Sequence, residues 1–345
     1  MRLWKRGHLR RFFGSGRVRF EEDAVQAADK AADLGASLLC WSKPPAELER
    51  DAAKRNLDLS RVEDGFLRSR GLGAKLVPPL SLVRDTTGIY FDATRPSDLE
   101  NLIGASRELP PAALDRARRL REKLIDLRLT KYNVGSSDQP AAPEDKTAIL
   151  VVGQVEDDAS VIYGAAQPLN TNEALLNAAR AERPDGFLIY KPHPDVEAGL
   201  RKGDIAAKTA DLVVRNADPV ALLDIVDEVW TISSLLGFEA LIRGVNVVCA
   251  GRPFYAGWGL TTDLPCALDD ALGERRSGAQ PTLDGVIHAA LIDYPRYHDP
   301  ATGSPCPVEV AVERLASGTV TEPGPRLRLL SKLQGLLASH DPFWR

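Results

Sequence analysis

The chain has 345 residues, of which 44% are hydrophobic and 27% are charged, so it can bury a substantial core and form two domains of ordinary size. Its formal net charge of −4 argues against a general nucleic-acid binder. The cysteines lie far apart, with no CxxC pair and no histidine at metal-ligand spacing, which favours a cytoplasmic protein without a structural metal. These four cysteines are Cys40, Cys249, Cys266 and Cys306.

Apolar runs typical of buried strands alternate with amphipathic stretches that have helical spacing. In chain order, the expected helices span 24–34, 111–129, 171–184, 219–227 and 235–244, and the expected strands span 35–41, 147–153, 186–191, 211–215, 228–233 and 245–251. This alternation predicts parallel sheet with crossover helices.

A polar segment rich in proline and serine, residues 134–146, follows the long charged helix and indicates a hinge. We therefore expect one α/β lobe over 1–135, a second over 146–275, and a helical tail over 276–345 that returns toward the first lobe. In open α/β sheets, ligands bind beyond the carboxyl ends of the strands. The residues that follow the strands are therefore the first candidates for a functional site.

Both ends of the chain are basic. "MRLWKRGHLRRFF" (1–13) mixes arginine and lysine with large apolar residues, and 326–345 mixes them with leucine. Neither segment has the long apolar run of a signal peptide or a transmembrane helix. Each fits a helix packed on the protein surface, and each also fits a segment that lies on an anionic membrane surface.

The strand at 147–153 runs into three consecutive carboxylates, Glu156, Asp157 and Asp158. In an extended segment, Glu156 and Asp158 project to one face and Asp157 to the other. Crowding of three carboxylates should raise the pKa of at least one of them. The same three residues also fit a solvated acidic turn, and Asp157 with Asp158 also fits a Mg²⁺ site.

Two further strands end in polar residues. "YKPHPDV" holds His193 between two prolines, so its imidazole is either a rigidly placed phosphate ligand or a structural histidine in a proline turn. "WTISS" places Ser233 and Ser234 at the start of a helix, where hydroxyl and free N–H groups can bind an anion. Serine caps are also common in helices that bind nothing.

A third polar cluster lies in the first lobe, in "RVEDGFLRSRGLGA" (61–74). Glu63, Asp64, Arg68 and Arg70 stand there among glycines. This stretch fits a solvated turn, and it also fits a site that binds a carboxylated substrate through arginine and moves a proton through Glu63.

Together these blocks resemble one protein family. "RVEDGFLRSRGLGA", "PPLSLVRDTTGIYFD", "LTKYN", "VVGQVEDDASV", "YKPHPDV", "SSLLGFEALIRG", "GRPFYAGWGLT" and "YPRYHDPATGSPCPVEVAVERL" look like the capsule polysaccharide biosynthesis protein KpsC and its relatives, which transfer 3-deoxy-D-manno-octulosonic acid (Kdo). The blocks run in order from about residue 61 to 315. KpsC resembles two transferase halves in tandem, and this chain has room for one, most similar to the C-terminal half.

The resemblance implies a GT-B-like fold, with two Rossmann-like lobes, an active site between them and the nucleotide held by the second lobe. It implies transfer from CMP-β-Kdo with retention of configuration, to a β-Kdo acceptor linked to lipid at the inner face of the cytoplasmic membrane. A peripheral position at that face gives the basic termini a purpose. Capsule assembly proteins are then expected partners, and nucleic acid is not.

The resemblance also assigns residues. Asp158 is the expected nucleophile of a double displacement, and a single phosphate demands no metal cofactor. Glu63 is the candidate base, with Asp64 second. For the nucleotide, the resemblance gives His193, Ser233 and Ser234, and Lys191 and Glu239 are further candidates. Charge complementarity, and not the resemblance, makes Arg68 and Lys131 candidates for the sugar carboxylate or the acceptor, with Asp157 and Glu156 beside them.

Two other functions stay open. A chain with this fold can be a non-catalytic component that binds lipid-linked glycan in a capsule assembly and export complex. It can also transfer another CMP-activated acidic sugar, such as sialic acid.

Overall fold

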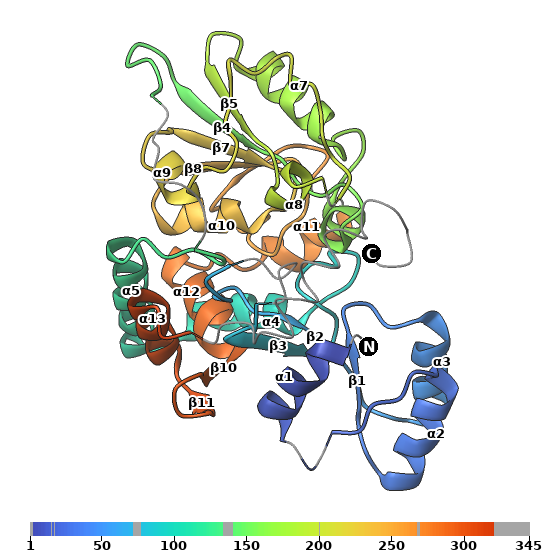
Figure 1. The fold of residues 1–345 in the computed structure, drawn as a ribbon. Coiled ribbons are helices and arrows are strands. Elements are labelled where there is room, and N and C mark those ends of the chain that lie inside the picture. The colour runs from blue at the N-terminus through green and yellow to red at the C-terminus, as the bar shows by residue number, and fades with distance from the viewer. Residues whose placement is uncertain are drawn as a thin grey trace.

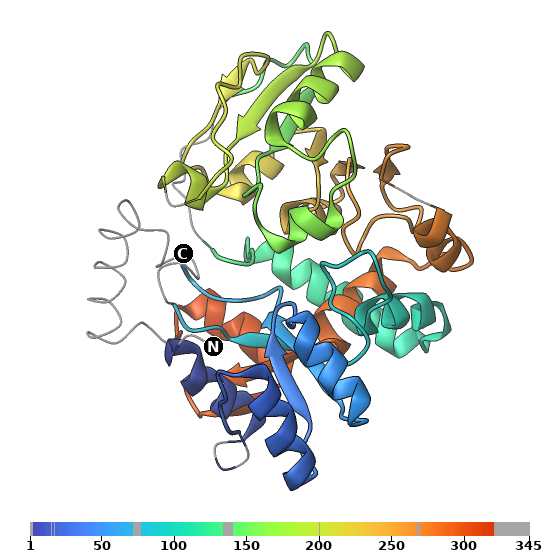
Figure 2. The same cartoon turned by 90° about the vertical axis from the view of Figure 1, so that its right-hand side faces the viewer.

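Two β-sheets form the centres of two α/β lobes, one above the other in Figure 1 and again in the turned view of Figure 2. The structure is a computed structural model that describes residues 3–14, 16, 18–71, 77–133, 141–199, 201–267 and 270–320. Most of the expected hinge, residues 134–140, and the basic segment 326–345 lie outside the described residues.

The first lobe has a five-stranded sheet in the order β1-β2-β3-β10-β11. Only β1 and β2 pair in parallel, and the other neighbours are antiparallel, so the expected parallel sheet is wrong for this lobe. Its strands are β1 (Leu38–Trp41), β2 (Leu59–Asp64), β3 (Ser81–Asp85), β10 (Pro295–Asp299) and β11 (Ser304–Cys306). Its helices are α1 (Leu3–Phe13), α2 (Ala24–Leu34), α3 (Ala46–Lys54), α4 (Asp98–Ala105) and α5 (Pro111–Asp126), with a 3₁₀ turn at Ser106–Glu108.

The segment after residue 275 is only partly helical, in contrast to the expected helical tail. It contains the end of α11 (Asp270–Ser277), α12 (Leu283–Ile287), a π-helix (His288–Asp293) and α13 (Val308–Ser317). Between the π-helix and α13, strands β10 and β11 join the sheet of the first lobe, where β10 pairs with β3. The pairing partner of β10 is more than two hundred residues away, so no local pattern indicates it.

The second lobe has a six-stranded parallel sheet in the order β6-β5-β4-β7-β8-β9. Here the predicted strands and the parallel sheet are confirmed, because runs such as "AILVV" in β4 are buried on both faces. The strands are β4 (Ala148–Val152), β5 (Phe187–Lys191), β6 (Leu212–Val213), β7 (Glu228–Thr231), β8 (Asn246–Cys249) and β9 (Thr262–Asp263). The helices are α6 (Ala159–Gly164), α7 (Asn172–Glu182), α8 (Pro194–Glu197), α9 (Pro219–Leu223) and α10 (Leu235–Ile242).

Several helices begin where the sequence carries a residue whose side chain caps the helix. The Thr171 side chain accepts the N–H of Ala174 at the start of α7, and the Asp23 side chain accepts that of Gln26 at the start of α2. Helix α2 ends at Gly35, whose φ of 59° is a left-handed conformation that glycine adopts without a Cβ clash.

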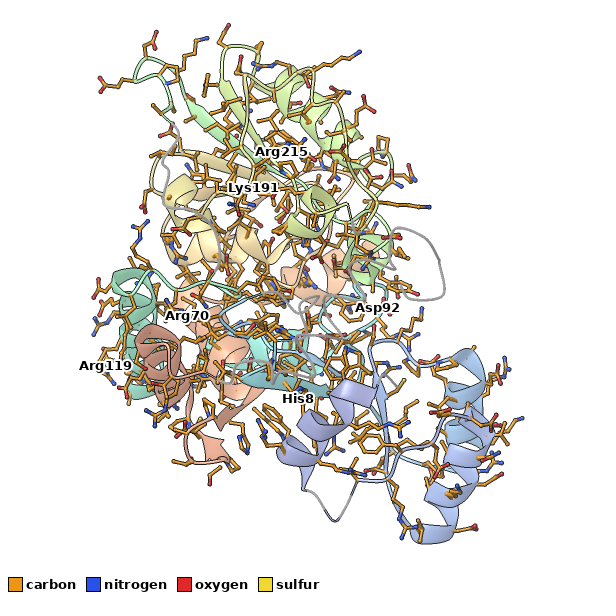
Figure 3. All side chains as sticks on the ribbon, in the orientation of Figure 1. His8, Arg70, Asp92, Arg119, Lys191 and Arg215 are labelled. Atoms are coloured by element: carbon orange, nitrogen blue, oxygen red, sulfur yellow. The ribbon has the colours of Figure 1, made fainter. Side chains whose placement is uncertain are left out.

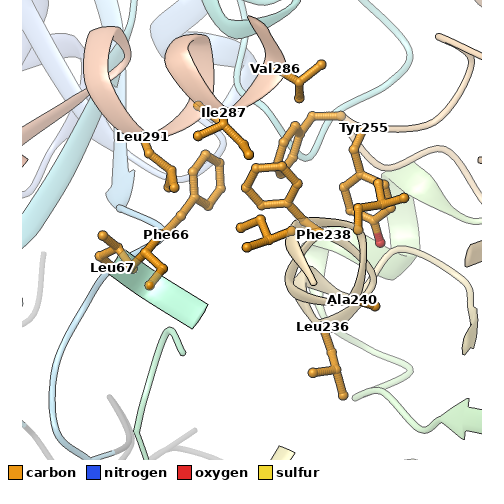
Figure 4. Packing of buried hydrophobic residues seen from close by; sticks show 14 of the residues in the cluster. Phe66, Leu67, Leu236, Phe238, Ala240, Tyr255, Val286, Ile287 and Leu291 are labelled. Carbon is orange, nitrogen blue, oxygen red and sulfur yellow. The ribbon is translucent and has the colours of Figure 1, made fainter. Parts of the chain in front are cut away.

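A large apolar cluster joins the two lobes. Phe66, after β2, stacks on Phe254 of the second lobe with ring centroids 4.8 Å apart. Figure 4 shows Phe66 and Leu67 together with Phe238 of α10 and Leu291 of the π-helix. The lobes therefore share one core, which fixes how the two candidate halves of the site face each other.

A buried ion cluster also crosses the junction. Glu100 of α4 accepts from Arg275 at 2.7 Å and from Arg276 at 2.9 and 3.1 Å. Arg276 also donates to the carbonyls of Pro253 and Ala256, at 3.0 and 2.6 Å. Because Glu100 and Arg276 are only 8% and 3% exposed, these ion pairs are buried at the junction of the lobes. We call the cluster of Glu100, Arg275 and Arg276 the clamp.

Candidate active site

Three adjacent strands of the second lobe carry candidate residues at their carboxyl ends. The order β5-β4-β7 places Asp158 in the middle, between His193 and Ser234. Strand β4 is the first of this lobe, and its neighbours β5 and β7 lie on opposite sides of it, so the strand order reverses here. Such a switch point is where open α/β sheets bind ligands.

Asp158 is the N-cap of α6. Its Oδ1 accepts the N–H of Ser160 at 3.0 Å and the hydroxyl of Ser160 at 2.9 Å. None of the described residues donates to Oδ2. One oxygen of this carboxylate is therefore fixed by the protein and the other is available to a substrate.

Glu156 and Asp157 do not join Asp158 in a shared site. The backbone N–H of Asp158 donates to the carbonyl of Val155 at 3.0 Å, so the segment is a turn and the expected extended geometry is wrong. Glu156 accepts the N–H of Asn172 at the start of α7, at 2.9 Å. The exposed Asp157 pairs with Arg201 at 2.8 Å.

A raised pKa is expected for at least one of the three carboxylates, and Asp157 is not that one. The hydrogen bond from Arg201 stabilises the ionised form and lowers the pKa of Asp157, and it outweighs the opposing effect of burial. The acidic run is thus divided among three different partners.

His193 is held in one tautomer. Its Nδ1 accepts the backbone N–H of Asp195 at 3.1 Å, so the ring proton lies on Nε2. Burial lowers the pKa of His193, and the charges of Lys191 and Lys131 act in the same direction, whereas Asp195 and Asp158 oppose it. A neutral imidazole with its proton on Nε2 can donate a hydrogen bond to an anion.

The two serines after β7 differ in what they can do. The Ser233 hydroxyl donates to the carbonyl of Ser160 at 2.9 Å and accepts from the amide of Gln154 at 3.1 Å. It is therefore used within the lobe, and its expected contact with a nucleotide is not supported. Among the described residues, the Ser234 hydroxyl only accepts, from the N–H of Leu236 at 3.2 Å, so its own proton can go to a ligand at the start of α10.

Two further nucleotide candidates, Lys191 at the end of β5 and Glu239 on α10, are engaged within the protein. Lys191 is 5% exposed, and its ammonium lies 3.5 Å from the carbonyl of Pro192, inside the second lobe as Figure 3 shows. Burial lowers its pKa, and the charges of Glu197 and Asp218 oppose this. Glu239 accepts the backbone N–H of Lys131 at 2.7 Å, so its carboxylate helps to join the lobes.

In the first lobe, the end of β2 carries two adjacent carboxylates with different environments. Arg68 donates from Nε to Oδ2 of Asp64 at 2.6 Å. Burial favours the neutral form of Asp64, but Arg68, Lys5 and Lys131 outweigh it and lower its pKa. Burial and the charge of Asp64 raise the pKa of Glu63 to about 7. One carboxylate thus stays ionised, and its neighbour can exchange a proton near neutral pH.

Lys131 lies between the lobes. Its carbonyl accepts the N–H groups of Arg68 and Ser69, at 3.1 and 3.2 Å. Its ammonium lies 5.2 Å from the centroid of the Tyr132 ring and forms no direct ion pair with a described residue.

The charge of Lys131 nevertheless acts on groups of both lobes. Burial would lower its pKa, but Tyr132, Tyr90, Asp64 and Glu63 raise it. The charge also lowers the pKa of His193. Lys131 is therefore a cation whose charge acts on candidate groups in both lobes.

The sequence patterns missed four residues of this arrangement. Gln154 and Ser160 lie within the acidic block, and Tyr90 and Tyr132 lie within "GIYFD" and "TKYN". A hydroxyl or amide beside a strand-end carboxylate is the signal that could have indicated the first two. Tyr90 could be identified only from the structure, in which its ring packs against that of Phe66 with centroids 4.8 Å apart.

Within the described ranges, no group of three or more histidine, cysteine, aspartate or glutamate side chains could hold a metal ion. Within the same ranges, no helix is long and apolar enough to cross a membrane. The absence of a metal and the location of the protein stay predictions.

Comparison with known proteins gives consistent likenesses. The model of the family described as "Capsule polysaccharide biosynthesis protein" matches residues 37–133 and 118–297. The capsule polysaccharide modification protein LipA of Neisseria meningitidis serogroup B is 43% identical over 321 residues, covering 91% of this chain and 44% of LipA. The lipopolysaccharide-processing protein LpsZ of Rhizobium meliloti is 42% identical, covering 91% of this chain and 72% of LpsZ. The chain thus spans less than half the length of LipA.

Two solved structures have the same fold. The β-Kdo 2,4 transferase of Thermosulfurimonas dismutans KpsC is 37% identical with a TM-score of 0.72, covering 82% of this chain and 88% of that one. The β-Kdo 2,7 transferase of the same KpsC is 33% identical with a TM-score of 0.74, covering 92% and 97%. These likenesses confirm the GT-B-like fold. The 2,4 transferase is the more similar of the two in sequence identity, and the 2,7 transferase is the more similar in TM-score and coverage. The greater similarity to the C-terminal half of KpsC therefore stays a prediction.

Proposed function

The chain belongs to the family of capsule polysaccharide biosynthesis proteins and is of the KpsC type, and from this we propose that it is a retaining glycosyltransferase. It takes Kdo from CMP-β-Kdo and adds it as a β-Kdo unit to a lipid-linked or growing capsule glycan. The names of the two solved neighbours, both β-Kdo transferases, support this proposal.

One observation carries the proposal. Strands β5, β4 and β7 are adjacent, and their ends bring a carboxylate with a free oxygen between a neutral imidazole and the N-terminus of α10. A CMP-activated sugar needs these groups side by side, because its single phosphate must be bound within reach of the anomeric carbon. The hydroxyl of Ser234 and the Nε2–H of His193 are the donors to that phosphate.

Two displacements then give retention. Oδ2 of Asp158 attacks the anomeric carbon, the bond from that carbon to the phosphate oxygen breaks, and CMP leaves with the electron pair. The acceptor hydroxyl then attacks the same carbon from the other face, and the ester bond to Oδ2 breaks and restores the carboxylate. Each step inverts the centre, so the product keeps the configuration of the donor.

Glu63 is the base for the second displacement. Its pKa of about 7 allows it to take the proton of the acceptor hydroxyl near neutral pH. Asp64 cannot share this role equally, because its ion pair with Arg68 stabilises the ionised form. Lys131 is the cation for the carboxylate of Kdo.

We place the protein at the inner face of the cytoplasmic membrane, where its lipid-linked acceptor is found. Helix α1 has no acidic residue and carries Lys5, Arg6, Arg10 and Arg11, which suits an anionic surface. Capsule assembly proteins are the expected neighbours there.

Intact-protein mass spectrometry tests the function. Wild-type protein, Asp158→Asn and Asp157→Asn are each incubated with CMP-Kdo generated in situ and a short β-Kdo acceptor, and glycan product and CMP binding are followed in parallel. We expect product from wild type and from the Asp157 control, and none from Asp158→Asn, which still binds CMP. A covalent Kdo adduct on wild type supports the two-step route.

Two outcomes contradict the proposal. If wild type neither transfers Kdo nor binds CMP, a glycan-binding component of the capsule assembly complex takes its place. If wild type binds CMP but transfers only from CMP-sialic acid in a donor screen, the enzyme class stands and the donor is wrong.

A further inference from the structure

A chain of hydrogen bonds leads from the end of β7 to the carboxylate of Asp158. Gln154, which is 5% exposed, accepts the N–H of Ser233 at 2.8 Å and donates to the Ser233 hydroxyl at 3.1 Å. The Ser233 hydroxyl donates to the carbonyl of Ser160 at 2.9 Å. Because each group in this chain is bonded on both sides, the start of α6 is tied to the neighbouring strand end.

Ser160 completes the chain at the nucleophile. Its N–H and its hydroxyl both donate to Oδ1 of Asp158, at 3.0 and 2.9 Å. The two oxygens of this carboxylate are therefore unequal, since Oδ1 has two donors and Oδ2 has none from the described residues. A carboxylate held in this way presents one defined oxygen to a substrate.

We infer that Ser160 is the positioning residue of the nucleophile, with Ser233 and Gln154 as its support. This inference rests on the proposed function. Ser160 fixes Oδ1 and thereby directs Oδ2 toward the anomeric carbon.

The same two donors act on the second displacement. When the ester to Oδ2 breaks, negative charge returns to both oxygens of Asp158, and the donors on Oδ1 stabilise it. In the ester, Oδ1 is an uncharged carbonyl oxygen and gains less from them. Loss of the Ser160 hydroxyl therefore favours the adduct and slows its breakdown, in addition to loosening the aim of Oδ2.

An ordinary helix cap explains the same bonds without any effect on the reaction. A cap contributes to stability alone, so its loss changes neither the rate of adduct breakdown nor kcat. Ser97 offers a matched control, because its side chain accepts the N–H of Glu100 at the start of α4, outside the candidate site.

The test uses the full chain with Ser160→Ala, Ser160→Thr and Ser97→Ala. The adduct is formed with CMP-Kdo, acceptor is added, and intact masses are read after rapid quenching, together with steady-state kcat and KM and the Kd for CMP. We expect Ser160→Ala to slow formation or breakdown of the adduct about 10- to 100-fold, the range for a lost hydrogen bond to a charged group. The Kd for CMP should stay within about two-fold, a range that a loss of less than 0.5 kcal/mol covers.

Ser160→Thr keeps a hydroxyl and should keep wild-type rates, as should Ser97→Ala. If both adduct rates of Ser160→Ala lie within about two-fold of wild type, the inference is wrong and Ser160 is a cap. If Ser160→Ala does not fold, Ser160→Cys replaces it, because a thiol keeps the size and donates only weakly. If wild type itself forms neither adduct nor product, the proposed function fails, which is a different result.

Discussion

Arg68 donates from Nε to Oδ2 of Asp64 at 2.6 Å, and the guanidinium group that makes this bond is fully buried. The bond keeps Asp64 ionised beside Glu63, and that charge helps to raise the pKa of Glu63 to about 7. Burial is the larger cause of the same shift. Arg68 therefore acts on the candidate base through Asp64, and its Nη2 atom is buried without a hydrogen-bond partner among the described residues.

The pKa of Glu63 predicts the pH dependence of the second displacement. A base acts in its ionised form, so breakdown of the adduct by acceptor should rise with pH through about 7 and level off above it. Glu63→Gln should still form the adduct from CMP-Kdo, but release it about 10²- to 10⁴-fold more slowly, the usual contribution of a positioned base. Quenched-flow mass spectrometry between pH 5.5 and 8.5 measures both steps.

Glu122→Gln is the control for this experiment, because Glu122 is half exposed on α5 and pairs with Arg118. A Glu63→Gln protein that breaks down its adduct with the wild-type pH profile would show that another group is the base.

Substitution of Ser234 and of Ser233, the two serines after β7, should have different effects on the affinity for CMP. Ser234→Ala removes the hydroxyl proton that can reach a phosphate, so the Kd for CMP should rise about 5- to 20-fold. Ser233→Ala removes internal bonds to Ser160 and Gln154, so it should lower the free energy of unfolding by about 1–2 kcal/mol and leave the Kd within about two-fold. Calorimetric titration and urea unfolding measure the two quantities, and equal losses of CMP affinity in both variants would contradict this assignment.

The sheet of the second lobe could be predicted because its strands are continuous apolar runs between capped helices. Strand β4 is buried along its whole length, and α7 begins at Asn172, directly after Thr171 as its N-cap. The strand order could not be predicted, since the pairing of β4 with both β5 and β7 depends on packing across the whole lobe. That order is what makes Asp158, His193 and Ser234 neighbours.

The first lobe was harder to predict because its strands carry charged residues. Strand β2 places Arg61 and Glu63 in a run that has the composition of a loop, and β3 carries Arg84. The roles of adjacent residues were also beyond the pattern. A turn closed by the hydrogen bond from Asp158 to Val155 gives Glu156 and Asp157 other partners than Asp158 has. The Ser233 hydroxyl is bound to Ser160, so Ser233 has a different role from Ser234.

The clamp between the lobes should be important for stability. Glu100→Gln leaves Arg276 buried without its counter-ion, so the free energy of unfolding should fall by about 3 kcal/mol or more. Glu122→Gln removes an exposed ion pair with Arg118 and should cost less than about 0.5 kcal/mol. Chemical unfolding followed by tryptophan fluorescence measures both, and similar losses would show that the buried cluster contributes no more than a surface pair.

Lys131 should influence both substrate binding and the pH profile. Lys131→Met keeps the length of the side chain and removes its charge, so the KM for the β-Kdo acceptor or for CMP-Kdo should rise about 10-fold or more, as expected when a carboxylate loses a cation. The charge of Lys131 lowers the pKa of Glu63, so without it that pKa rises and the half-maximal rate of adduct breakdown moves above pH 7. Lys54→Met on α3, where the side chain is 73% exposed, should change neither quantity.

A rise in KM with an unchanged pH profile would support Lys131 as a ligand for the carboxylate of Kdo, but would show that its charge does not affect the pKa of Glu63. An unchanged KM with a shifted profile would show the reverse, so the two readings separate binding from control of the base.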